Sequence, residues 1–235
     1  MTKRIAIIPA RGGSKRVPDK NIRDFCGNPM ISYPLRAAAE SGLFDVVHVS
    51  TDSARITRMV NEIGFNVDFP RPDELADDVT GIMPVLKYVL EEYRTRGQEF
   101  DQVCLLMATA ALIDSDDLKG AAALHDKVDS DKSVLGVVPY SVPIEWAFEL
   151  NSDNSLTPVQ PGMFATSSQE LSEKYHDAGV FTFFSASRVL ESEGDGKDND
   201  IYAYPLPKYK AVDIDDADDW RIAEAMFRMI DLSGS

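Results

Sequence analysis

The chain has 235 residues, of which 44% are hydrophobic and 27% charged, and these ordinary globular values exclude wholesale disorder. Its formal net charge of -15 argues against a nucleic-acid partner, and no apolar run approaches the roughly 18 residues of a membrane span. We therefore expect one cytoplasmic domain over residues 1–235 with two reduced, buried cysteines, Cys26 and Cys104, and no membrane partner.

Apolar runs and helical patterns alternate along the chain, which predicts an α/β fold with a doubly wound, mainly parallel sheet. The predicted strands cover residues 4–9, 45–52, 65–69, 101–109, 133–140, 179–184, 201–206 and 209–214. The predicted helices cover residues 28–44, 53–64, 81–97, 114–128 and 215–232. Because ligands of such sheets bind beyond the C-terminal ends of the strands, we expect the segments that follow these strands to share one edge.

Residues 140–178 interrupt this alternation, since their aromatic and proline-rich sequence has neither a long helical nor a long strand pattern. An insertion of this kind is either an arm that packs on a partner or a lid over a substrate. We expect one domain with an inserted arm at about 140–178.

The basic loop that follows the first strand reads "ARGGSKR". Residues 1–36 hold eight Lys or Arg against two Asp, although the chain as a whole is acidic. We expect Gly12 and Gly13 to allow positive φ angles, so that backbone N–H groups approach a polyphosphate held by Arg11, Lys15 and Arg16. The spacing is not that of a Walker A motif, and a glycine turn with solvated basic residues is the alternative.

A second candidate site lies in "AVDIDDADDW" near the C-terminus. In a strand, Asp213 and Asp215 would point to the same face, and two carboxylates there fit a Mg²⁺ ion completed by ligand phosphates. Asp216, Asp218 and Asp219 are expected to cap and charge the final helix, and a cap is also the alternative for Asp215.

Five motifs together resemble the acylneuraminate cytidylyltransferase family, and they cover essentially the whole chain. In chain order they are "IIPARGGSKRVPDKNI", "VVHVSTDS", "RPDELADDVT", "YHDAG" and "VDIDDADDW". Within that family, "SQELSEKYHDAG" is most similar to pseudaminic acid cytidylyltransferases. The segment "MATAAL" keeps Thr109 but lacks the prolines of the family's usual P-T-S/A-P segment, which makes the identity of the sugar less secure than the reaction class.

The resemblance implies a Rossmann-like nucleotidyltransferase that couples CTP to a nine-carbon 2-keto sugar acid, with pseudaminic acid favoured over sialic or legionaminic acid. It implies Mg²⁺ as cofactor and a homodimer formed through the arm. The nucleotide-binding residues it implies are Ala10, Arg11, Gly12, Gly13, Ser14, Lys15, Asn21 and Arg71. The sugar-binding residues are Thr109, His176 and Asp177. Arg11, Lys15, Asp213 and Asp215 are the catalytic residues, the last two as ligands of the metal.

Two other functions stay open at this point. A metal-dependent glycosyltransferase could use "DID" as a D-x-D motif on a similar fold, although the basic Gly-Gly loop favours a nucleoside triphosphate. A non-catalytic nucleotide-binding homologue is the second alternative.

Overall fold

The computed structural model describes residues 2–13, 16–77, 79–129, 131–194 and 199–233. In this part of the chain, six strands form the central sheet in the order β10 (Ile201–Pro205), β6 (Ser133–Pro139), β9 (Tyr175–Ser185), β5 (Gln102–Leu106), β1 (Arg4–Pro9) and β4 (Val46–Ser50). β9 runs antiparallel to β5 and β6, and the other neighbours pair in parallel. The prediction of a mainly parallel sheet is confirmed.

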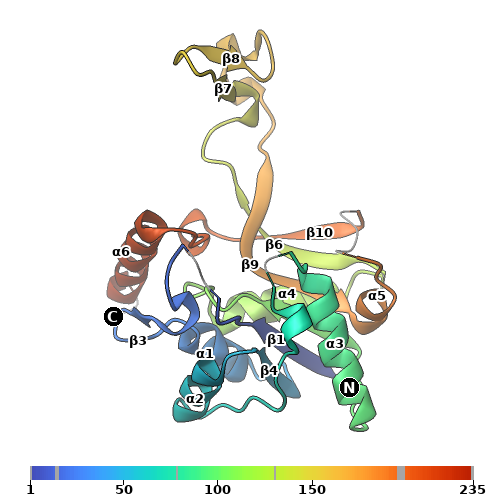
Figure 1. Ribbon diagram of the computed structural model, residues 1–235. Coiled ribbons are helices and arrows are strands. Elements are labelled where there is room, and N and C mark those ends of the chain that lie inside the picture. The colour runs from blue at the N-terminus through green and yellow to red at the C-terminus, as the bar shows by residue number, and fades with distance from the viewer. Residues whose placement is uncertain (1, 14–15, 78, 130, 195–198, 234–235) are drawn as a thin grey trace.

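Helices cover both faces of the sheet (Figure 1). They are α1 (Ser32–Ser41), α2 (Ala54–Glu62), α3 (Ile82–Thr95), α4 (Ser115–His125), α5 (Ala186–Leu190) and α6 (Ala217–Ser233). The central strand β1 shows why, because its side chains alternate between two cores. Ala6 and Ile8 pack with α1, α2 and α4, whereas Ile5 and Ile7 pack with α3 and α5. None of the helices in the described part of the chain is long and apolar enough to cross a membrane.

Capping residues fix where these helices begin and end. The Ser53 hydroxyl accepts a hydrogen bond from the N–H of Ile56 at the start of α2, as predicted. Asp114 and Asp117 form a capping box at the start of α4, in which each carboxylate accepts the other residue's N–H. Gly42 ends α1 in the left-handed conformation with a φ of 63°.

A third, smaller core joins the two ends of the chain. Val17 and Phe25, from the segment after β1, pack with Ile214 and with Trp220 of α6. Phe25 belongs to β2 (Asp24–Phe25), which pairs with β3 (Asn28–Pro29). This core places the acidic C-terminal segment beside the basic loop.

Two predicted strands are wrong. Residues 65–69 form no strand, and residues 209–214 begin within the 3₁₀ helix η6 (Lys208–Lys210) and continue as a loop. The predicted strand at 179–184 is the second part of β9, an eleven-residue strand with an irregular register between Leu135 and Val137 of its neighbour β6. The short helix α5 was not predicted.

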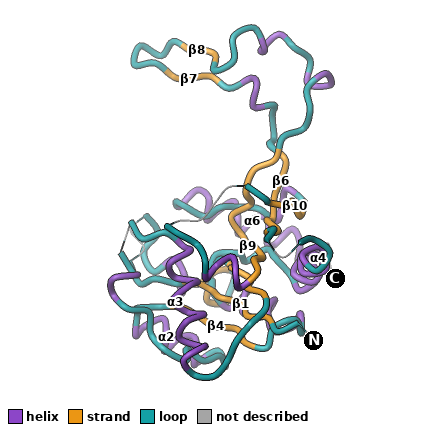
Figure 2. The backbone as a smooth tube through the Cα atoms, turned by 90° about the vertical axis from the view of Figure 1, so that its right-hand side faces the viewer, coloured by secondary structure: helices purple, strands orange, loops and turns teal. Residues whose placement is uncertain are grey.

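The inserted segment projects as an arm from the body of the protein (Figures 1 and 2). Its tip carries the hairpin of β7 (Phe148–Leu150) and β8 (Leu156–Pro158), and its other elements are the 3₁₀ helices η3 (Ile144–Trp146), η4 (Met163–Ala165) and η5 (Ser168–Glu170). Residues 175–178, expected in the arm, belong to β9.

Candidate active site

A cavity of about 290 Å³ opens where β1 and β5 end, at the C-terminal edge of the parallel strands. Its walls come from the loop after β1, the 3₁₀ helix η1 (Lys20–Ile22), the segment 71–82 and the loop after β5. Six of the residues expected in the site line it: Arg11, Arg16, Asn21, Arg71, Thr109 and Asp215. The edge predicted from the sequence is therefore where these residues gather.

The Gly-Gly turn is held against the start of α2. The Ala10 N–H donates to the Ser50 carbonyl at 2.9 Å, and the Gly12 N–H donates to Oδ1 of Asp52 at 3.0 Å. Neither Gly12 nor Gly13 adopts the positive φ that a glycine allows. A β-carbon on Gly12 would lie 3.0 Å from Cβ of Ser53, a close approach that favours glycine. Ser14 and Lys15 lie outside the described residues.

Arg11 and Asn21 fix the next part of the loop. Nδ2 of Asn21, a buried residue, donates to the Arg11 carbonyl at 3.1 Å. Nη1 of Arg11 donates to the carbonyl of Asp77 at 2.7 Å. The guanidinium of Arg11 therefore joins the basic loop to the segment 71–82 across the cavity.

Arg71 is the buried cation of the cavity, with only 6% of its surface exposed. Its Nε and Nη2 donate to the hydroxyl and carbonyl oxygens of Ser50, at 3.1 and 2.8 Å. Burial lowers its pKa, opposed by the charge of Asp52. It forms no ion pair with a carboxylate of the described residues, so a ligand atom in the cavity can provide the partner that a buried charge needs.

Two further cations line the cavity: Arg16, which was expected at a polyphosphate, and Lys20, to which the sequence analysis assigned no role. Nη2 of Arg16 lies 2.7 Å from Oδ1 of Asp215. Nζ of Lys20 donates to the Ile214 carbonyl at 2.6 Å and lies 3.9 Å from the same oxygen of Asp215. The sequence signal for both residues is the basic run that follows "ARGG". Arg11, Arg16, Lys20 and Arg71 thus surround a cavity whose lining carboxylates are Asp77 and Asp215.

Asp213 and Asp215 flank the buried side chain of Ile214 in a loop, not in a strand. Burial, followed by the charge of Asp215, raises the pKa of Asp213. The helix-cap reading of Asp215 is wrong, since Oδ1 of Asp216 accepts the N–H groups of Asp218 and Asp219 at the start of α6.

Two adjacent carboxylates, one of them disfavoured in its charged form, are a donor set that suits Mg²⁺. Within the described residues no third His, Cys, Asp or Glu completes the group, so the remaining ligands would come from phosphate or water.

The three residues expected at the sugar divide between two places. Thr109 lines the cavity, whereas His176 and Asp177 do not. His176 is exposed and its ring lies 4.7 Å from that of Tyr140. The charge of Asp177 contributes, after burial and the charge of Asp215, to the raised pKa of Asp213. Gly179 has a φ of 66° and lies beside the Asp213 carboxyl. A β-carbon at Gly179 would lie 3.5 Å from Cγ of Asp213.

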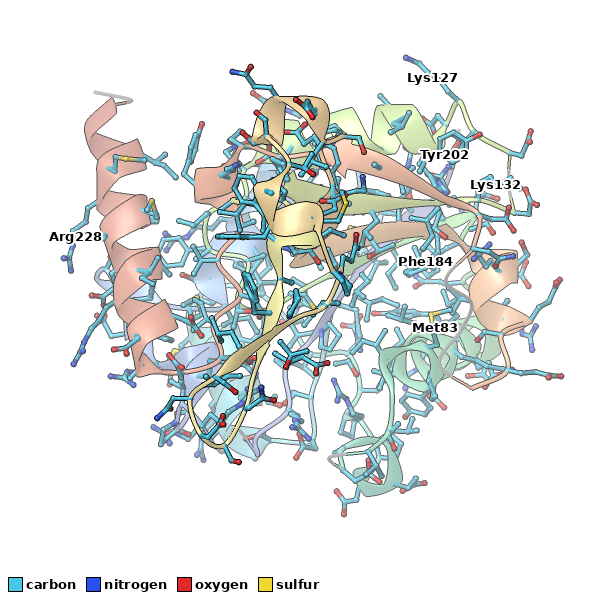
Figure 3. The ribbon with its side chains drawn as sticks, turned by 90° about the horizontal axis from the view of Figure 1, so that it is seen from above. Met83, Lys127, Lys132, Phe184, Tyr202 and Arg228 are labelled. Atoms are coloured by element: carbon cyan, nitrogen blue, oxygen red, sulfur yellow. The ribbon has the colours of Figure 1, made fainter. Side chains whose placement is uncertain are left out.

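A second cavity, of about 890 Å³, follows the sheet face formed by β5, β9 and β6. Asp177 lines it, as do Met83 and Phe184, which lie near each other in Figure 3. Ile82 lines both cavities, so they are neighbours.

The loop after β5 is ordered without the prolines that were expected there. The Met107 N–H donates to the Val180 carbonyl at 2.8 Å, and the Ala110 N–H donates to the Met107 carbonyl at 3.0 Å. Met107, Ala108 and Thr109 all line the first cavity. One of these hydrogen bonds reaches β9 and the other lies within the loop. Together they restrict the loop backbone, which proline would otherwise do in part.

Comparisons with known proteins agree with this geometry. A family model described as Cytidylyltransferase matches residues 5–189. A pseudaminic acid cytidylyltransferase of Campylobacter jejuni is 35% identical over 229 residues, covering 97% of each chain. A CMP-N,N'-diacetyllegionaminic acid synthase of Legionella pneumophila is 29% identical and covers 96% of each chain. A solved structure of CMP:2-keto-3-deoxy-manno-octonic acid synthetase complexed with CTP shares the fold, with a TM-score of 0.70 at 18% identity over 97% of this chain and 99% of that one.

Proposed function

The chain belongs to the cytidylyltransferase family, and from this premise we propose that it couples CTP to pseudaminic acid and releases pyrophosphate. The observation that carries the proposal is the cavity at the sheet edge, which four cations line together with Asp215. Pseudaminic acid is favoured over legionaminic acid because the relative named for it is 35% identical, against 29%. Sialic acid is also a candidate, since an N-acylneuraminate cytidylyltransferase of Streptococcus agalactiae is 32% identical over 93% of this chain, although only 52% of that longer chain is covered.

The chain's own cations would bind the nucleotide. Arg11, Arg16 and Lys20 stand at the side of the cavity formed by the basic loop, where they can neutralise a triphosphate. Lys15, in the same loop, is proposed to do so as well. Nε and Nη2 of Arg71 bind Ser50. The other N–H groups of the Arg71 guanidinium would donate to a neutral acceptor such as the cytosine carbonyl.

Asp213 and Asp215 would hold a Mg²⁺ ion that arrives with the triphosphate. When bound, the ion withdraws negative charge from the phosphate oxygens. The anomeric hydroxyl of the sugar acid would attack the α-phosphorus. A new O–P bond forms, the hydroxyl proton passes to water, and the bond from the α-phosphorus to the bridging oxygen breaks, so that this oxygen leaves with pyrophosphate. Arg11, Lys15, Arg16 and Lys20 stabilise the charge that moves onto the pyrophosphate.

The sugar acid would lie between Thr109 and the edge that carries His176 and Asp177. His176 and Asp177 stand outside the first cavity, so a sugar acid that reached them from Thr109 would extend beyond it. We propose that the arm of a second copy closes the sugar site in a homodimer. Large apolar side chains of the arm support this, since Val142, Leu150, Leu156, Val159 and Phe164 are each more than half exposed.

A panel of sugar acids tests the proposal. The enzyme would be incubated with CTP and Mg²⁺ and with pseudaminic, legionaminic or N-acetylneuraminic acid, and pyrophosphate release would be followed. We expect the highest kcat/KM with pseudaminic acid. Faster pyrophosphate release with another acid would identify that acid as the substrate. If no acid led to pyrophosphate release, the proposed activity would be rejected. Transfer of the sugar from a CMP-sugar to an acceptor would instead support a glycosyltransferase.

A further inference from the structure

Lys210 is a half-buried lysine outside the cavity, and it joins two of the segments that form the site. Its side chain is 11% exposed, and Nζ lies 2.5 Å from Oδ2 of Asp114 and 2.7 Å from Oδ2 of Asp117. Asp114 and Asp117 are the capping box of α4. One ammonium group is thus held by both carboxylates of a helix N-terminus, and its contact with Asp117, whose side chain is 10% exposed, is the more sheltered of the two.

The two segments that Lys210 joins are both functional. Asp114 follows directly on the loop after β5, which supplies Met107, Ala108 and Thr109 to the cavity. Lys210 ends η6, three residues before Asp213. The contact therefore fixes the start of the Asp213–Asp215 loop relative to the wall of the cavity.

This loop depends on side-chain contacts because it has no strand partner. Lys20 binds the carbonyl of Ile214 in the middle of the loop. At its end, Oδ2 of Asp219 accepts the N–H groups of Asp215 and Asp216 at 2.9 and 3.1 Å. At the start of the loop, the hydrogen bond from the Ala211 N–H to the Lys208 carbonyl is long, at 3.4 Å. Ala211 and Val212 pack against apolar cores there, and Lys210 is the charged anchor on that side among the described contacts.

We propose that Lys210 is a positioning residue for Asp213 and Asp215, holding the two carboxylates at the spacing that a divalent ion needs. The inference rests on the proposed function, since it assigns these residues to the metal. Residues behind the ligands of a metal typically change its affinity by about 10- to 100-fold when they are replaced.

The test measures metal binding directly, without turnover. Mn²⁺ would be titrated by electron paramagnetic resonance into the enzyme saturated with cytidine 5′-(α,β-methylene)triphosphate. We expect Lys210→Met to weaken Mn²⁺ binding by about tenfold or more and Lys210→Arg, which keeps the charge, to recover most of the affinity. The matched control is Lys208→Met, because Lys208 is exposed in the same 3₁₀ helix and contacts only the Tyr140 carbonyl, at 3.4 Å. It should bind Mn²⁺ as the wild type does.

Hydrogen exchange separates positioning from a purely structural role. A positioning role predicts faster exchange in residues 211–216 of Lys210→Met, together with the weaker Mn²⁺ binding. A structural role predicts faster exchange only in 114–118, with Mn²⁺ affinity unchanged, and this result would overturn the proposal.

If Lys210→Met does not fold, Lys210→Met with Asp117→Asn takes its place. This double variant removes the unpaired buried carboxylate and keeps an oxygen that accepts the Asp114 N–H. It should show the same loss of Mn²⁺ affinity, and wild-type affinity would overturn the inference. Failure of the wild type to bind Mn²⁺ with the nucleotide would instead reject the proposed metal site.

Discussion

Nη2 of Arg16 and Oδ1 of Asp215 are 2.7 Å apart, although 199 residues separate them in the sequence. The pair joins the basic loop after β1 to the acidic loop before α6. Because the two side chains are 70% and 40% exposed, the pair contributes little to stability. Under the proposed function, a Mg²⁺ ion at Asp215 and a phosphate at Arg16 would replace both halves of the pair.

Asp215→Asn should reduce kcat by about 10² or more, because a carboxylate proposed to hold the metal loses its charge. The thermal midpoint should stay close to that of the wild type, since Asp216 and not Asp215 caps α6. The matched control is Asp216→Ala, which should lose about 1 kcal/mol of stability. Steady-state kinetics at several Mg²⁺ concentrations and thermal unfolding check both variants. An unchanged kcat and Mg²⁺ dependence in Asp215→Asn would remove it from the metal site.

Arg71→Lys should raise the KM for CTP by about tenfold, because a lysine cannot hold both oxygens of Ser50 and still donate into the cavity. The control is Arg58→Lys, at an exposed position of α2. Isothermal titration with CTP measures the change directly. Equal affinities in the two variants would show that Arg71 has no contact with the nucleotide.

Lys15→Ala should lower turnover by about 10² or more through the loss of a charge that stabilises the transferring phosphates. Lys15→Arg should recover only part of the rate, because the guanidinium is bulkier. Lys3→Ala, at an exposed position before β1, is the control. A wild-type kcat/KM for CTP in folded Lys15→Ala would refute the role of Lys15.

The free energy of unfolding should fall as the pH is lowered from about 6.5 to 4, through His48. Its burial lowers the pKa of the ring from 6.5 to about 4, and the ring stacks on Phe69 and contacts the Tyr93 hydroxyl. Between these two pH values the unfolded chain binds the proton and the folded protein does not, so the stability present above pH 6.5 is lost on acidification. The loss is on the order of 3 kcal/mol at full extent.

The measurement is urea unfolding of the wild type and of His48→Gln across this pH range. Other groups, including the buried His125, titrate in both proteins, so the difference between the two curves isolates His48. Parallel curves would mean that His48 does not contribute to the acid sensitivity.

The arm should make the protein a dimer in solution. Leu150→Asp combined with Phe164→Asp should yield a monomer, because these side chains are 71% and 65% exposed in the single chain and a charge in an apolar interface is costly. Glu149→Gln, on the same hairpin, should remain a dimer. The molar mass of each variant, measured by light scattering at micromolar concentration, distinguishes the dimer from the monomer. A fully active wild-type monomer would contradict the role given to the arm.

Local sequence signals predicted most of the fold. Ser53, Gly42 and the acidic start of α4 mark their helices through hydrogen bonds to neighbouring residues, which is why they can be read from the sequence. Pairing between distant strands left no such signal. The apolar pattern of β9 is the same in either direction, so its antiparallel course could not be predicted.

The sequence named most of the charged residues of the candidate site, but it did not predict that Asp213 and Asp215 lie in a loop. The alternation around Ile214 is typical of a strand, yet the chain leaves the sheet after the edge strand β10 and finds no strand partner. Lys20 binds the Ile214 carbonyl in place of a neighbouring strand, and Lys210 anchors the loop from behind. Both contacts join residues more than 90 positions apart, which no local pattern reveals.

Phosphorus NMR of one reaction mixture tests the central claim most directly. The wild-type enzyme would be mixed with CTP, Mg²⁺ and pseudaminic acid, and the phosphorus signals followed with time. We predict that one phosphodiester signal and pyrophosphate appear in equal amounts while CTP disappears. Release of orthophosphate with CDP, or CTP that stays intact while the folded protein binds it, would contradict cytidylyl transfer at this cavity.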